Sequence, residues 1–261
     1  MPAQIELSKL SVRQFAERFR GEMIPLSNTF SYFCASLPMS DDDLREYLQE
    51  PVAALPPKIA AALPKISILL VPYLERVNAS ERGSEKGREK TPASDYVSIE
   101  KPPESRLSTS THVQLGEETF LAFALKDQEV AEYHYRFYHL IATVMGEHWS
   151  EDLETRYSRL LREELNAEAH GEVDEPSWRL KQGLRRAKNA SGARNFRTYA
   201  RQSFIDTLTL YLHGICCDID VETGPRQLPS RYLRRRLNVL YSLYPPPAGY
   251  AVFPEHQERA E

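Results

Sequence analysis

From Asp127 to Leu243 the apolar residues recur every three or four positions, and this spacing limits what the chain can fold into more than any other feature. A helix with an apolar stripe must bury it, so several such helices in succession predict a bundle. The clearest stripe lies between Asn195 and Cys217. Helix start signals occur before it at Ser150 and after it at Pro229.

Ahead of these helices, the segments Thr111–Leu115 and Thr119–Leu125 flank Gly116-Glu117 and predict a β-hairpin. The second segment is almost continuously apolar, which favours a strand covered on both faces. Nearer the N-terminus, Ser11 and Gln14 have the spacing of a capping box, and short helices fit between the prolines. The branched, apolar stretch from residue 66 to 74 is compatible with a buried strand or a short helix.

Between these regions, the stretch from residue 78 to 95 reads NASERGSEKGREKTPASD, and its only apolar side chains are alanines. Such a composition buries too little surface to offset the entropy lost on ordering. The predicted fold class is therefore α+β, predominantly α-helical, in three parts: a helical N-terminal part at 1–77, a flexible linker at 78–110, and a hairpin plus helical bundle at 111–261. A single core shared by the first and third parts stays open as an alternative.

The charge and apolar content exclude several functional classes. The net charge is −4 over 261 residues, which disfavours general binding to nucleic acid or to an acidic membrane surface. No apolar run approaches the roughly 20 residues of a membrane-spanning helix, and no secretory signal is visible. The three cysteines, Cys34, Cys216 and Cys217, do not suggest a disulfide framework. We therefore expect a cytoplasmic protein without a membrane span.

No complete catalytic or nucleotide-binding motif is present. A hairpin followed by a histidine-bearing helix resembles the zinc peptidases of the zincin type. Aligned on His139, however, the catalytic glutamate position holds Leu140 and the second histidine position holds Thr143. This resemblance implies at most an inactive zincin-like scaffold.

A second group of ligand-type residues lies at the end of the Asn195 helix, where His213 and Cys216 are three residues apart. An acidic stretch follows that begins like a calcium loop but lacks its glycine and its closing glutamate. No cofactor is predicted outright, and zinc is the metal that this mixture of ligands would favour. The candidate metal ligands are His139, His213, Cys216, Asp218 and Asp220.

Charge is unevenly distributed along the predicted bundle. Residues 147–175 hold ten acidic and three basic residues, a net charge of −7, whereas residues 176–240 hold thirteen basic and four acidic, a net charge of +9. Antiparallel packing would let the two blocks neutralise each other. Alternatively, the basic block would bind nucleic acid or an acidic partner. The candidate residues for that role are Arg185, Arg186, Arg194, Arg197, Arg201, Arg234, Arg235 and Arg236.

These features favour a non-enzymatic interaction or regulatory protein that acts through a protein partner and has a protease-sensitive linker. A metal-dependent hydrolase, or an inactive zincin-like scaffold, is the first alternative. A nucleic-acid-binding protein that uses the basic region 185–236 is the second. A metal assay on the purified protein separates the first two readings, and oligonucleotide binding tests the third.

The linker prediction can be tested by limited proteolysis. Exposed segments of small and charged residues are cut preferentially, so we expect the first cleavage between Val77 and Ser110. Mass spectrometry of the early fragments locates the cut. A first cut within Asp127–Leu243 would contradict the predicted organisation.

Overall fold

The computed structural model describes residues 10–35, 37–77, 94–186, 192–217 and 227–252. Its internal contacts divide the chain into two compact units, one formed by 1–49 with 63–133 and the other by 50–62 with 134–261. The division falls between Tyr133 and His134, so the predicted hairpin belongs to the first unit. Among the described residues, no helix combines the length and apolar character needed to cross a bilayer.

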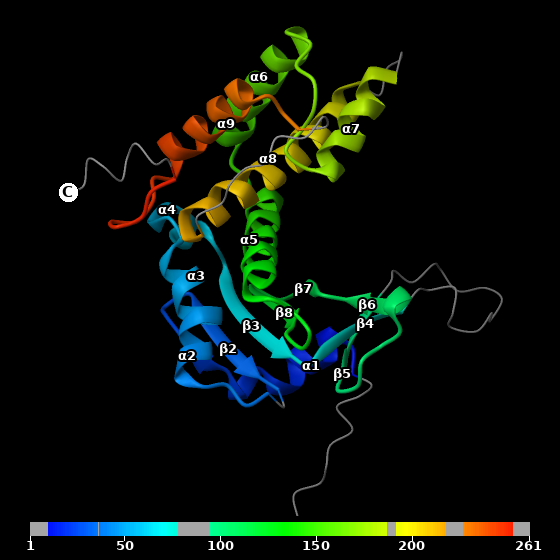
Figure 1. The fold of residues 1–261 in the computed structure, drawn as a ribbon, viewed down its shortest axis with the longest axis vertical. Helices are drawn as coiled ribbons and strands as arrows, with labels where there is room; N and C mark the ends of the chain where they lie inside the picture. Colours follow the sequence, from blue (N-terminus) through cyan, green and yellow to red (C-terminus); the bar gives the residue numbers. More distant parts are fainter. Residues whose placement is uncertain (1–9, 36, 78–93, 187–191, 218–226, 253–261) are drawn as a thin grey trace, which may run out of the picture. The chain divides into compact units, whose positions relative to one another are not determined.

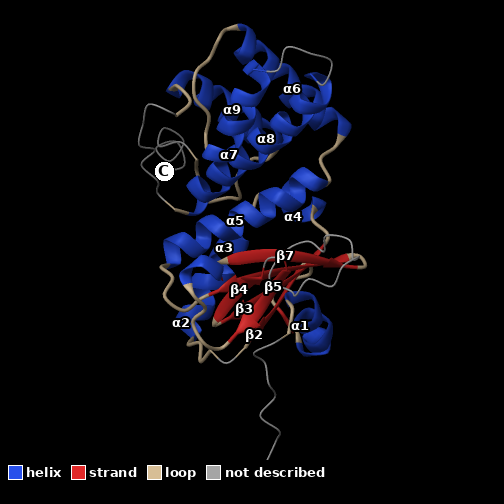
Figure 2. Ribbon diagram, turned by 90° about the vertical axis from the view of Figure 1, so that its right-hand side faces the viewer, coloured by secondary structure: helices blue, strands red, loops and turns tan. Residues whose placement is uncertain are grey.

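The first unit is built on a five-stranded sheet, drawn in red in Figure 2. The three central strands are mutually parallel, and each outer strand runs antiparallel to its neighbour. In sheet order the strands are β1 (Ile24–Pro25), β2 (Phe30–Cys34), β3 (Lys65–Val71), β8 (Glu118–Ala124) and β7 (Ser110–Leu115). Strands β3 and β8 are buried almost throughout, which explains their near-continuous apolar sequences.

Helix α1 (Val12–Phe19) packs against one face of this sheet. The predicted capping box is present, because the Ser11 hydroxyl accepts from the Gln14 amide while the Gln14 side chain accepts from the Ser11 amide. Phe15 is fully buried in a cluster that includes Leu69 of β3 and Phe120 of β8. The helix is therefore fixed by a local cap and by the apolar face of two central strands.

Two sequence-based expectations for residues 1–110 were wrong. The N-terminal part is not simply helical, because β1 to β4 lie within residues 1–77; its helical segments are α1, η2 (Arg20–Glu22), α2 (Asp41–Leu44), η3 (Arg45–Gln49), α3 (Glu50–Ala53) and α4 (Pro57–Ala62). Residues 94–110 of the predicted linker are ordered, while residues 78–93 lie outside the described residues. The ordered part contains β5 (Ser94–Ser98), η5 (Glu104–Arg106) and β6 (Leu107–Ser108).

The ordered part of the predicted linker gains its structure from pairing. Strands β5 and β6 flank β4 (Tyr73–Val77) in a three-stranded antiparallel sheet. Val97 is buried, and Arg76 forms an ion pair with Asp95 across the strands at 3.0 Å. The composition of residues 94–110 did not indicate strands, because β5 and β6 form only by pairing with β4, which lies earlier in the chain.

The second unit is helical, and its long helices follow the predicted periodicity. The Ser150 hydroxyl caps one of them by accepting from the Leu153 amide, as expected. Tyr157, Phe204 and Leu208 are fully buried at the helix contacts. The long helices are α5 (Val130–Glu147), α6 (Glu151–Asn166), α7 (Glu175–Arg186), α8 (Gly192–Cys216) and α9 (Ser230–Leu243). The predicted fold class, α+β and mainly helical, is confirmed.

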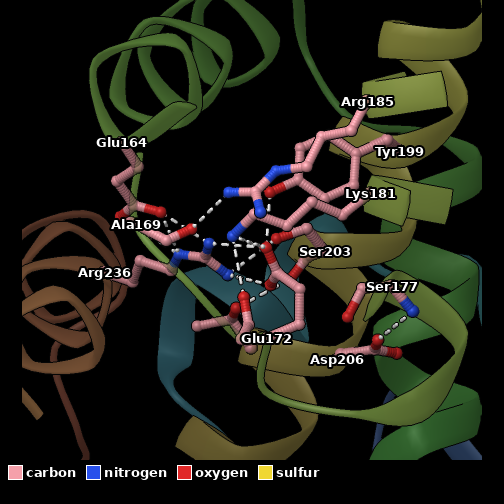
Figure 3. Close-up of polar contacts among 12 residues, drawn as sticks. Glu164, Ala169, Glu172, Ser177, Lys181, Arg185, Tyr199, Ser203, Asp206 and Arg236 are labelled. Carbon is pink, nitrogen blue, oxygen red and sulfur yellow. Dashed lines mark hydrogen bonds and ion pairs between the residues drawn. The ribbon is translucent and has the colours of Figure 1, made fainter. Parts of the chain in front are cut away.

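A cluster of buried charges lies between these helices (Figure 3). The Arg236 guanidinium of α9 is fully buried and donates to Glu164 of α6 at 2.6 Å and to Glu172 at 2.7 Å. Lys181 of α7, also buried, lies 3.0 Å from Glu172. Tyr199 of α8 donates to the same carboxylate. Two cations and two carboxylates thus neutralise one another without water contact.

Electrostatics holds this cluster in its charged form. Burial on its own raises the pKa of Glu172, but the positive charge and hydrogen bonds of Arg236, assisted by Lys181 and Tyr199, outweigh burial and hold the pKa at about 2. Breaking a buried ion pair by removing one partner typically costs about 3–5 kcal/mol, because the remaining charge is stranded. An exposed pair contributes only about 0–1 kcal/mol.

We predict that Arg236→Leu destabilises the helical unit by about 3–5 kcal/mol, since Glu164 and Glu172 would lose their shared cation. The matched control is Arg235→Leu, at the neighbouring position, where an exposed arginine pairs with exposed Glu163; its cost should stay within about 1 kcal/mol. Urea unfolding followed by tryptophan fluorescence reports on this unit, because both tryptophans of the chain lie within it. Equal losses for the two variants would contradict a special role for the buried cluster.

Candidate metal centre

Three potential metal ligands converge in the second unit. His134 lies in the early part of α5, Cys216 is the last residue of α8, and Cys217 follows it. One ligating atom from each residue lies within 4.8 Å of the other two. His134 is 5% exposed, and the two thiols are half-buried.

The pairing of α5 with α8 brings these residues together. A Cβ atom added to Gly146 would lie only 2.8 Å from a side-chain carbon of Ile205, so the two helices are very close at that point. His134 is twelve positions before Gly146, and Cys217 is twelve positions after Ile205. The two helices run in opposite directions and have the same rise per residue. Equal numbers of residues from the Gly146–Ile205 contact therefore lead to neighbouring positions, which are occupied by His134 and Cys217. The His134 Nδ1 atom lies 3.4 Å from the Cys217 Sγ atom.

The separations suit a single thiophilic ion. In a tetrahedral zinc site the metal–sulfur distance is about 2.3 Å and the metal–nitrogen distance about 2.0 Å. These distances place neighbouring ligand atoms roughly 3.5–4 Å apart, within the spread seen for His134, Cys216 and Cys217. The described residues would supply three ligands, so a fourth tetrahedral position would have no ligand from this part of the chain.

The local environment favours a thiolate at Cys216. A hydrogen bond from Cys217 lowers the pKa of Cys216 most strongly, burial opposes this, and hydrogen bonds from His134 and Tyr138 lower it further. The same interaction raises the pKa of Cys217, which keeps its proton as the donor. The site therefore provides one ready thiolate, and a metal ion would displace the proton of the second thiol.

The predicted ligands are distributed differently from this group. Cys216 belongs to it, whereas His139 contacts Thr209 through its Nδ1 atom at 3.4 Å. His213 lies beside the group, with its ring 6.2 Å from the ring of Tyr138, and its buried Nε2 atom has no hydrogen-bond partner among the described residues. Asp218 and Asp220 fall outside the described residues.

Two members of the group, His134 and Cys217, were not among the predicted ligands. His134 is five positions from His139 and does not share a helix face with it, so the sequence pattern does not group the two. The vicinal cysteines were the available signal, since two thiols at one helix end can serve one ion. The histidine that completes the group could only be identified once the register of α5 against α8 was known.

Several of the arginines predicted to bind nucleic acid or an acidic partner already form ion pairs or hydrogen bonds within the protein. Arg236 is fully buried and therefore has no access to a partner. Arg185 and Arg186 lie near the end of α7, where Arg185 donates to the carbonyl of Ala169 at 3.2 Å. Arg194 and Arg234 are exposed. Ion pairs with the acidic block are made by Arg197 with Glu154, Arg201 with Glu147 and Arg235 with Glu163.

A cleft in the first unit that contains charged and hydroxyl side chains was also missed by sequence reasoning. Its volume is about 850 Å³, and Arg20, Ser31 and Glu118 contribute to its lining. Glu118 pairs with Arg20 at 2.8 Å and accepts the hydroxyl proton of Ser67, which lies 2.8 Å from the Ser31 hydroxyl. Since the Ser67 proton is committed to Glu118, Ser31 donates to Ser67.

The metal-free protein should show contrasting thiol reactivity. Burial raises the pKa of Cys34 to about 11, whereas hydrogen bonding lowers that of Cys216. After chelation, iodoacetamide at neutral pH should therefore modify the Cys216–Cys217 pair well before Cys34, because the thiolate is the nucleophile. Peptide mass spectrometry over a time course gives both rates in one sample. Faster modification of Cys34 would contradict the thiolate assignment.

We compared the chain with known proteins to ask whether a relative uses these residues. No protein-family model, curated protein or solved structure matches it. We therefore infer function from the geometry of the chain's own side chains.

Proposed function

We propose that this chain is a non-enzymatic interaction protein that, unlike the metal-free protein expected from the sequence, binds one zinc-class ion through His134, Cys216 and Cys217. The observation that carries the proposal is the convergence of three ligating atoms from two helices within 4.8 Å. A cytoplasmic location, where thiols stay reduced, is part of the proposal. The protein partner expected from the sequence also remains part of it.

The ligand types select the class of metal. Imidazole together with thiolates suits zinc and other thiophilic ions rather than magnesium or calcium, which prefer oxygen ligands. A divalent ion with two thiolates forms a neutral group, which reduces the penalty of placing charge in a half-buried site. Glu50 lies close enough to raise the pKa of Cys217, so an additional negative charge also faces the site.

Binding an ion here would have a structural effect. The last turn of α8 is closed by a hydrogen bond from the Cys217 amide to the His213 carbonyl at 2.8 Å. A metal bound to His134 as well would tie this helix end to α5. Because ion binding to the folded state adds directly to folding stability, the helical unit should unfold later in the presence of the metal.

Cobalt titration of the chelator-treated full chain tests the proposal. We expect one equivalent of Co²⁺ to bind with a thiolate-to-metal charge-transfer band, and Zn²⁺ to displace it. Cys216→Ser and Cys217→Ser should each abolish or strongly reduce the band. His134→Ala should weaken binding by removing the only nitrogen ligand of the group.

Two matched variants serve as controls. Cys34→Ser removes a thiol of the other unit, and His139→Ala removes a histidine of α5 that lies outside the group. Both should keep the charge-transfer band and the stoichiometry. Loss of binding in His139→Ala with retention in His134→Ala would overturn the ligand set, and the absence of any charge-transfer band would overturn the function.

A metal-dependent hydrolase is the second candidate, and it is favoured by a fourth coordination position that no described residue would fill. A water molecule bound there would be acidified by the ion, and Glu50 is a carboxylate whose charge already acts on the site. Ester hydrolysis that depends on added Zn²⁺ and is lost in Glu50→Gln would support this candidate over a purely structural ion.

A further inference from the structure

A second concave site lies on the helical unit, between α6 and α9, which Figure 1 shows in green and orange. Its volume is about 230 Å³. Arg156, Arg159 and Glu163 of α6 line it together with Arg235 and Ser242 of α9. Three guanidinium groups and one carboxylate thus surround a small space.

The three arginines differ in how far they are already neutralised. Arg235 is paired with Glu163 across the cleft. Arg156 pairs at 3.0 Å with Asp152, one turn earlier on the same helix. Within the part of the chain that the structure describes, no ion pair or hydrogen bond is found for Arg159. Arg159 is therefore the one guanidinium of the cleft lining whose charge no described carboxylate neutralises.

The size of the cleft limits its occupant. Pockets for drug-sized ligands and cofactors usually measure about 300–1,000 Å³, so a volume of about 230 Å³ suits a single charged group. Planar guanidinium groups match the geometry of phosphate oxygens and can bind them in a bidentate manner. The Ser242 hydroxyl adds a polar group at the same wall.

We propose that this cleft binds a dianionic phosphate group, such as that of a phosphate monoester, through Arg159 and Arg235. Glu163 forms an ion pair with Arg235 when no phosphate is bound, and it therefore competes with phosphate for the Arg235 guanidinium. A dianion that displaces Glu163 from Arg235 meets two guanidinium charges, those of Arg159 and Arg235, whereas a phosphodiester, with one negative charge, leaves one of them unmatched. The site is separate from the metal centre, and its residues include none of the three proposed metal ligands.

The competing role of Glu163 distinguishes this proposal from a surface ion pair without function. Removing an arginine of the site should weaken phosphate binding, whereas removing the acidic competitor should strengthen it. A structural role for the same residues would not produce opposite changes in affinity. Because the side chains of Arg235 and Glu163 are 50% and 46% exposed, their replacement should leave the fold intact.

Calorimetric titration of the full chain with inorganic phosphate, at constant ionic strength with chloride as the balancing anion, measures the affinity. We expect Arg159→Gln to weaken binding about tenfold, in line with the loss of one charge-assisted contact. Glu163→Gln should tighten binding severalfold. Arg179→Gln, which removes an exposed arginine paired with Glu175 on α7, should change nothing.

Dimethyl phosphate provides the second arm of the test. Weaker binding of this monoanion than of inorganic phosphate supports a monoester site. Equal or tighter binding would overturn it and point to a nucleic-acid backbone. The proposal also fails if inorganic phosphate does not bind, or if Arg159→Gln and Glu163→Gln shift the affinity in the same direction.

Discussion

The helical unit depends on the ion pairs of Arg236. This guanidinium is removed from water, so its charge must be neutralised by groups from other parts of the chain. Glu164 from α6 and Glu172 from the segment before α7 supply the carboxylates, while Lys181 and Tyr199 complete the hydrogen bonds. Apolar stripes would allow the helices to slide or rotate against each other at modest cost. A charge network of fixed geometry accepts far fewer arrangements, so we regard it as the feature that sets their register.

Local patterns were enough to identify the helices and one hairpin. Capping residues such as Ser11 and Ser150 and the stripe through Phe204 are read within one or two turns, and the glycine turn between β7 and β8 is equally local. Strand β2 and the short β5 were not predicted, and β3 was left open between a strand and a helix, because each becomes a strand by pairing with residues far away in sequence. Composition described the region after residue 77 as a linker, yet a few apolar side chains such as Val97 suffice for a strand once β4 is beside it.

The candidate sites show the same limit. Cys216 was identified from its residue type and its histidine neighbour, but His134 joins it only through the packing of two long helices. Conversely, Arg236 was grouped with Arg235 as part of a basic surface, since neighbouring arginines in a sequence look alike. On α9 the neighbouring residues Arg236 and Arg235 point in different directions. Arg236 is therefore a fully buried structural cation, whereas Arg235 is exposed and lines a cleft. Residue chemistry was therefore readable from the sequence, whereas accessibility required the fold.

The central position of β3 also has a consequence for the order in which the chain acquires structure. This strand pairs with β2 on one side and with β8 on the other, and its second partner begins only at Glu118. Sheets closed by such distant segments fold more slowly than structures with local contacts. During synthesis, β3 leaves the ribosome with one edge uncovered and stays so until β8 has followed. An apolar strand in that condition can associate with other chains, so the nascent protein should depend on chaperones more than its mainly helical composition suggests.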